Sequence, residues 1–190
     1  MSNPDFLTRL REIGRNIPLA YREERFAQVE EELLTLLDIA GSPGDKCDVL
    51  CVLANHYHYL QNDALGLEAL QKSVAYCPDD VNAWIGLTEH FHYHDVDLTR
   101  AAECVETALQ KATAANALVR QVLGVRLRIA LEQDNHDLVN ATLTSLIDFV
   151  PSKGSIDVAF ETDFISRMPL QFIDRALLER YKALAGVGVS

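Results

Sequence analysis

The fold is decided by the stretch LCVLANHYHY, residues 50–59, and by its counterpart WIGLTEHFHY, residues 84–93. The two stretches are 34 residues apart, and leucine, aromatic and histidine positions coincide between them. The matched pairs are Leu53 and Leu87, Tyr57 and Phe91, His56 and His90, and His58 and His92. Chance seldom aligns so many rare residue types at one offset. The chain therefore contains an internal repeat, which is the signature of a stacked architecture.

Each copy of the repeat begins with an amphipathic helix. Leu50, Leu53, Ala54 and Tyr57 recur at positions i, i+3, i+4 and i+7, which places them on one face of an α-helix. The whole chain of 190 residues has only nine glycines and six prolines, and the runs between them are rich in alanine, leucine and glutamate. These features predict an all-α protein.

The order of large, small and aromatic positions resembles the tetratricopeptide repeat (TPR). The first copy has its closing proline at Pro78, and in the second the connecting turn, residues 94–98, is longer by one residue. A third copy carries the diagnostic Leu123-Gly124 pair and a closing Pro151, but Arg120 stands where a large apolar residue is usual. The apolar and small positions that complete the three copies are Gly66 and Leu70, then Ala101, Val105 and Ala108, then Leu127, Val139, Leu143 and Leu146.

The resemblance implies an all-α, TPR-like α-solenoid, a right-handed superhelix of antiparallel helix pairs that forms a single domain over residues 1–190. We expect repeats at 47–80, 81–115 and 116–151, with capping helices at 1–46 and 152–190, because the terminal repeats of a solenoid would otherwise expose their apolar faces. In the N-terminal cap, the pattern predicts a short helix that ends near Asn16-Ile17-Pro18 and a second helix striped by Phe26, Val29, Leu33 and Leu36.

The C-terminal cap is expected to contain two helices. Ile156, Phe160 and Phe164 indicate the first, and Pro169 starts a second that carries Phe172, Leu177, Leu178 and Tyr181. These aromatic residues also suggest a surface through which two copies of the chain join, so a homo-oligomer is one possible state.

Charge and composition narrow the classes of partner. The formal net charge is −11, and residues 47–119 carry ten acidic against three basic side chains. This balance disfavours nucleic acid, which requires clustered Lys and Arg, and a partner that binds the acidic middle is expected to be basic. Apolar runs are too short to span a membrane, and no signal peptide is visible, so we expect a cytoplasmic protein with reduced cysteines.

Five of the six histidines fall in two runs, His56-Tyr57-His58 and His90-Phe91-His92-Tyr93-His94. Residues two apart on a helix point about 200° apart, so neighbouring histidines of a run cannot bind one ion together. Only His90 and His94 have the i, i+4 spacing of a helical metal pair, and no third protein ligand is evident from the sequence. We therefore predict no metal site and no cofactor, and keep a metal-binding protein that uses the histidine runs as an alternative.

The TPR resemblance also implies where a partner binds. In that family, residues beside the apolar stripe of each first helix line a concave groove, and the repeat register stacks His58 on His92. The residues carried over to this groove are Asp48, Asn55, His58, Tyr59, Asn82, Glu89, His92, Tyr93, Gln121 and Arg128. Their mixture of carboxylate, amide, imidazole and phenol groups suits hydrogen bonding to a peptide. It lacks the lysine and arginine cluster with which some members bind C-terminal carboxylates.

Nothing in the sequence predicts catalysis. A Gly-rich phosphate loop, an HExxH motif and a nucleophile elbow are all missing from the sequence, so we do not expect an enzyme. The sequence thus favours a module that binds a peptide or helix of another protein. A second alternative is a chaperone for a secreted client, because the chain resembles type III secretion chaperones in size, charge and repeat number.

Overall fold

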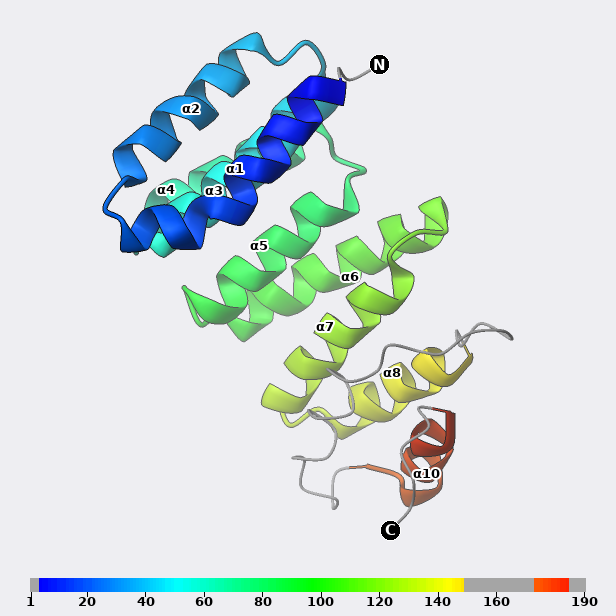
Figure 1. The fold of residues 1–190 in the computed structure, drawn as a ribbon. Coiled ribbons are helices and arrows are strands. Elements are labelled where there is room, and N and C mark those ends of the chain that lie inside the picture. Colours follow the sequence, from blue (N-terminus) through cyan, green and yellow to red (C-terminus); the bar gives the residue numbers. More distant parts are fainter. Residues whose placement is uncertain (1–3, 149–172, 185–190) are drawn as a thin grey trace. The chain divides into compact units, whose positions relative to one another are not determined.

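The computed structural model describes residues 4–148 and 173–184, which form nine helices and no strand (Figure 1). The chain has the TPR-like, all-α solenoid fold expected from its repeats. The helices are α1 (Pro4–Arg22), α2 (Phe26–Ile39), α3 (Pro43–Tyr59), α4 (Asp63–Tyr76), α5 (Val81–Tyr93), α6 (Leu98–Ala115), α7 (Val119–Glu132), α8 (His136–Asp148) and α10 (Arg175–Leu184). They divide into two compact units, Met1–Cys104 and Val105–Ser190, with the division inside α6.

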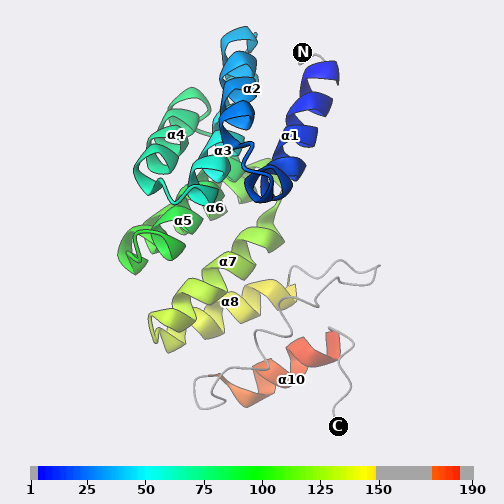
Figure 2. The same cartoon turned by 60° about the vertical axis from the view of Figure 1, so that its left-hand side comes forward.

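In the first unit, α3 is the central helix and contacts α1, α2, α4 and α5 (Figure 2). Its apolar stripe is buried as predicted, since Leu50, Leu53 and Ala54 are at most 3% exposed. The stripe ends at Tyr57, whose hydroxyl donates a 2.9 Å hydrogen bond to Glu30 Oε1 on α2. Burial and the bond to the carboxylate raise the pKa of Tyr57 to about 12, so the phenol remains a donor at neutral pH.

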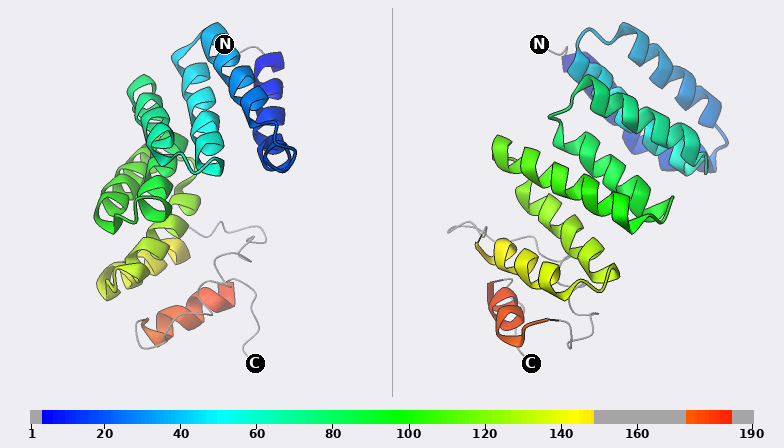
Figure 3. Two further views of the ribbon diagram at one scale, coloured as in Figure 1. Left: turned by 90° about the vertical axis from the view of Figure 1, so that its left-hand side faces the viewer. Right: turned by 180° about the vertical axis from the view of Figure 1, so that it is seen from behind.

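In the second unit, α7 packs against α8, and α8 packs against α10 (Figure 3). Arg126 on α7 is paired with Glu106 on α6 and donates a 3.0 Å hydrogen bond to Thr142 Oγ1 on α8. One guanidinium thus joins three helices of this unit. The apolar residues predicted for the third copy are buried as well: Leu123, Leu127, Val139, Leu143 and Leu146.

Side-chain caps fix where most of these helices begin. Asn62, Asp80 and Asn135 each accept a hydrogen bond from the backbone N–H three residues later, at the starts of α4, α5 and α8. Helix α7 begins without a side-chain cap, because it follows Leu118, which has a left-handed backbone and makes no side-chain cap bond. Helix α3 starts at Ser42-Pro43, before the expected repeat boundary at residue 47.

The predicted end of the first helix near Pro18 is also wrong, since α1 continues through Pro18 to Arg22. A proline inside a helix removes one backbone hydrogen bond and crowds the preceding turn, at a cost of about 3 kcal/mol. Ile17 and Ala20 on either side of it are at most 2% exposed. Burial of this face offsets the cost of the proline, because packing contributes more to the stability of a helix in a protein than propensity does.

Several C-terminal expectations lie outside the described residues, namely Pro151, Ile156, Phe160, Phe164, Pro169 and Phe172. On α10, Leu178 and Tyr181 are buried, at 2% and 4% exposed. Tyr181 is therefore a packing residue of the second unit. This corrects its assignment to a surface that joins two copies of the chain.

We predict that Gly86→Ala destabilises the protein by about 1 kcal/mol, measured by chemical or thermal unfolding. A Cβ at Gly86 on α5 would lie 2.6 Å from Leu70 Cδ2, a buried side chain of α4. Overpacking there outweighs the gain of about 1 kcal/mol that alanine brings to a helix. Gly14→Ala on α1 is the matched control and should stabilise, because its Cβ would meet Val52 Cγ1 at an ordinary 3.6 Å. Equal effects of the two substitutions would contradict the packing argument.

Candidate functional site

The surface predicted on the first helix of each pair is largely accessible. On α3 and α5, the exposed positions repeat with the same spacing, so each set occupies one helix face. The exposed residues of the predicted set are Asp48, Asn55, Tyr59, Asn82, Glu89, Tyr93 and Gln121, and His58 and Arg128 are half-buried. Tyr59 and Tyr93 are 43% and 52% exposed, so about half of each side chain is accessible to solvent.

The assignment of His92 to this surface is wrong. His92 is only 5% exposed, so its imidazole belongs to the protein interior. The predicted stacking of His58 on His92 does not occur either. His58 instead lies against His90 and His94, with ring centroids 5.2 Å and 3.9 Å away. The repeat offset of 34 residues aligns His58 with His92 in the sequence. In the structure the ring of His58 lies against His90 and His94, the residues two before and two after His92.

A cleft of about 460 Å³ includes two of the predicted residues, Asp48 and Asn82. Helix α1 forms one wall of this cleft through Leu7, Leu10, Arg11, Gly14 and Arg15, and α3 and α5 form the rest through Asp48, Cys51, Val52 and Asn82. Two clefts of similar volume on the α1–α2 side include none of the predicted residues. We call the first one the α1–α3–α5 cleft.

The sequence prediction missed the wall that α1 supplies. Leu7, Leu10, Arg11, Gly14 and Arg15 share one face of α1, by the same helical periodicity that identified the other stripes. The sequence pattern assigns this face to an N-terminal cap, because a cap needs only an apolar stripe. The arginines beside the stripe were the available signal for a binding wall, since an arginine interleaved with apolar residues suits recognition of another protein.

Asp48 is an electrostatically unfavourable residue in this cleft. Partial burial raises the pKa of its carboxyl above the usual value of 3.8, and the nearby carboxylates of Asp80 and Asp45 raise it further. Arg11 across the cleft lowers it in part. A carboxylate held beside other carboxylates costs folding free energy, which is typical of residues retained for binding.

Two cysteines lie near the cleft and are packed around one serine. The sulfur atoms of Cys47 and Cys51 are 3.0 Å and 3.2 Å from Ser73 Oγ on α4. All four cysteines of the chain are free. The hydrogen bond with Cys51 and burial raise the pKa of Cys47, so this thiol is protonated at neutral pH and chemically inert.

Asp48→Asn should raise the melting temperature slightly at pH 7. Because the folded protein binds the Asp48 proton more tightly than the unfolded chain does, the ionised carboxylate lowers stability above its folded-state pKa. This penalty is lost as the pH falls towards the usual value of 3.8, so the gain from Asn should shrink there. Thermal unfolding of the variant and of the control Asp38→Asn, on exposed α2 surface, checks the expectation. A gain that is constant with pH would exclude the electrostatic cause.

Comparison with known proteins identifies the fold. No protein-family model matches the chain, and no curated protein matches it. A solved structure does match: a crystal structure of TPR-like repeats described as a putative kinesin light chain of Podosopora anserina. The match covers 97% of each chain with a TM-score of 0.63 and 13% sequence identity. At this identity the similarity concerns the fold, and the chain has the TPR-like helical repeat fold.

Proposed function

We propose that this chain is a non-catalytic module that binds a segment of another protein in the α1–α3–α5 cleft. The observation that carries the proposal is the convergence of Asp48 and Asn82, chosen from the repeat pattern, with the arginines of α1 around one cleft. The TPR-like fold supports a role in protein interaction generally. The lining of the cleft supports this position for the partner segment.

The lining of the cleft determines what kind of segment it suits. Leu7, Leu10 and Val52 offer apolar surface, whereas Arg11 and Asp48 offer opposite charges on facing walls. Such a surface favours a peptide that carries an apolar side chain to bury and polar groups of both signs around it. The acidic middle of the sequence predicted a basic partner. Arg11 and Arg15 in the cleft wall could in addition bind a carboxylate group of the partner segment.

The continuation of the exposed face along α3 and α5 extends the surface for a partner. Asn55 and Tyr59 lie on the same face of α3 as Asp48, and Glu89 and Tyr93 lie on the corresponding face of α5. A segment several residues long can therefore contact the cleft and this face together. A tyrosine is a favourable residue at such a place, because its ring and hydroxyl bind with little loss of side-chain entropy.

The cytoplasmic location and the secretion-chaperone alternative stay predictions from sequence. Size, charge and repeat number suggested the chaperone, and the described residues add no feature specific to a secreted client. In the parts of the chain that the structure describes, no helix is both long and apolar enough to cross a membrane.

A photo-reactive amino acid in place of Asn82 should cross-link one partner protein in living cells. Asn82 is exposed and lies in the cleft, so a bound segment will be within reach of its side chain. The control is the same substitution at Gln71, an exposed position on α4 outside the cleft. Mass spectrometry should identify an adduct at position 82 that is missing at position 71. Identical adducts at both positions, or none at position 82, would refute binding in the cleft.

A further inference from the structure

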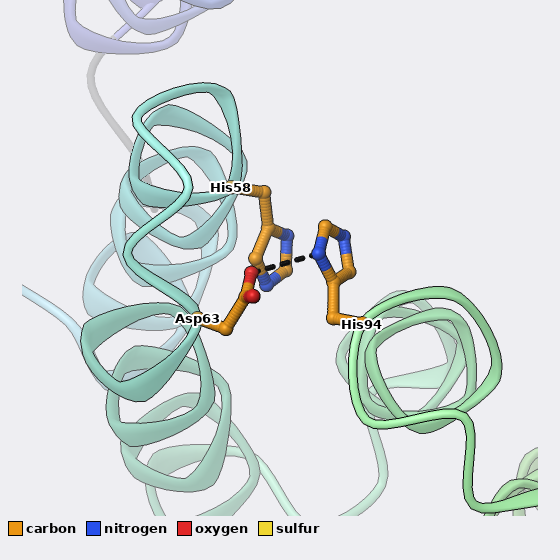
Figure 4. A group of neighbouring side chains, drawn as sticks. All are labelled: His58, Asp63 and His94. Carbon is orange, nitrogen blue, oxygen red and sulfur yellow. Dashed lines mark ion pairs between the residues drawn. The ribbon is translucent and has the colours of Figure 1, made fainter.

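Three metal-ligating side chains meet where α3 and α5 end and α4 begins (Figure 4). His58 lies in the last turn of α3, Asp63 is the first residue of α4, and His94 caps the C-terminus of α5. One ligand atom from each lies within 4.8 Å of the other two. All three belong to the first unit, and they come from two neighbouring helix pairs.

We propose that His58, Asp63 and His94 bind one divalent first-row transition metal ion, Zn²⁺ being the ion that suits them best. Two imidazole nitrogens and one carboxylate oxygen are a common set of protein ligands for zinc, with water as the fourth. Metal–ligand bonds of roughly 2.0–2.2 Å place tetrahedral ligand atoms about 3.3–3.6 Å apart. The three ligand atoms lie within 4.8 Å of one another, and the closest pair, Asp63 Oδ1 and His94 Nδ1, is 2.7 Å apart, so small rotations of these side chains would bring all three to metal-binding distances.

The contact between Asp63 and His94 is the first argument for a cation. Oδ1 of Asp63 lies 2.7 Å from Nδ1 of His94 (Figure 4), but this oxygen has no hydrogen-bond partner and is buried from solvent. The ring nitrogen and the oxygen therefore approach closely outside hydrogen-bond geometry. The two atoms attract each other only when a positive charge lies with them, and either a proton on His94 or a metal ion bound by both atoms can supply that charge.

His90 supports His58 from behind. His90 is only 1% exposed, and its Nδ1 lies 3.0 Å from Nε2 of His58. Its other nitrogen, Nε2, faces Asp95 Oδ2 at 3.4 Å, which favours the proton on that nitrogen. Nδ1 of His90 is then the acceptor, Nε2–H of His58 is the donor, and Nδ1 of His58 keeps its lone pair. Metal-bound histidines typically donate their second N–H to a neighbour in this way.

The backbone of α4 leaves space for this arrangement. A Cβ at Gly66 would lie 2.5 Å from Nε2 of His58, so any larger residue would displace the ring. The rings of His58 and His94 are stacked 3.9 Å apart, with an angle of 17° between them. His94 has 28% of its side chain exposed, which gives its ring room to turn towards an ion.

An ion at this position would join the ends of α3 and α5 to the start of α4. The sequence pattern paired His90 with His94 within one helix and did not show that His58 and Asp63 lie beside His94. The site is independent of the proposed cleft function, since none of its three ligands lines the α1–α3–α5 cleft.

Isothermal titration of the full, tag-free chain with Zn²⁺, after chelator treatment and dialysis, tests the proposal. We expect one ion per chain and a higher melting temperature when Zn²⁺ is present. His94→Ala and Asp63→Asn should each weaken binding at least about tenfold and remove the thermal shift. Both variants should keep the helical circular dichroism spectrum, because these two side chains lie at helix ends.

His136→Ala is the matched control, since His136 is an exposed histidine on α8. It should bind Zn²⁺ as the unmodified chain does. Lack of stoichiometric binding by the unmodified chain would overturn the proposal. So would unchanged affinity in folded His94→Ala or Asp63→Asn, because the ion would then be bound elsewhere, for example by the cysteines.

Discussion

The close approach of helices at two glycines is the constraint on which the first unit depends. Gly66 on α4 lies under the ring of His58 from α3, and Gly86 on α5 lies under Leu70 from α4. In each case a side chain of one helix occupies the space that a Cβ would need on the next. Glycine inside a helix costs about 1 kcal/mol relative to alanine, and here that cost permits a contact that no other residue allows.

This packing determines which surfaces remain for binding. Because α3 is covered by α1, α2, α4 and α5, its accessible residues are confined to the face that carries Asp48, Asn55 and Tyr59. Helix α1 lies along α3, with Gly14 beside Val52 and the ring of Tyr21 6.3 Å from that of Tyr59, and its Arg11 and Arg15 form the opposite wall of the cleft. The histidines at the other end of α3 meet the loop into α4 and the end of α5. One helix thus contributes to two sites of different chemistry.

The sequence predicted the elements whose signals are local. Apolar stripes at helical spacing located α2 and α3, and the repeat offset located α5. The groove positions also follow from the repeat, because helical periodicity decides which side chains point outward. His92 was the exception. Its position beside the apolar stripe predicted an accessible side chain, but other parts of the protein cover it.

What the sequence could not give are the consequences of tertiary packing. The course of α1 through Pro18 depends on burial of Ile17 and Ala20, which a local pattern with a proline does not reveal. The contact of His58 with His90 and His94 depends on how far α3 is shifted along α5 when the two helices pack. Neither the repeat length nor the two histidine runs reveal that shift.

In the proposed complex a partner segment lies in the α1–α3–α5 cleft. Hydrogen exchange measured by mass spectrometry, on the chain alone and in the purified complex with its partner, tests this most directly. We predict slower exchange in the complex within residues 7–15 of α1 and 48–52 of α3, which form the cleft walls. Unchanged exchange in both stretches, with protection confined to other helices, would contradict the account.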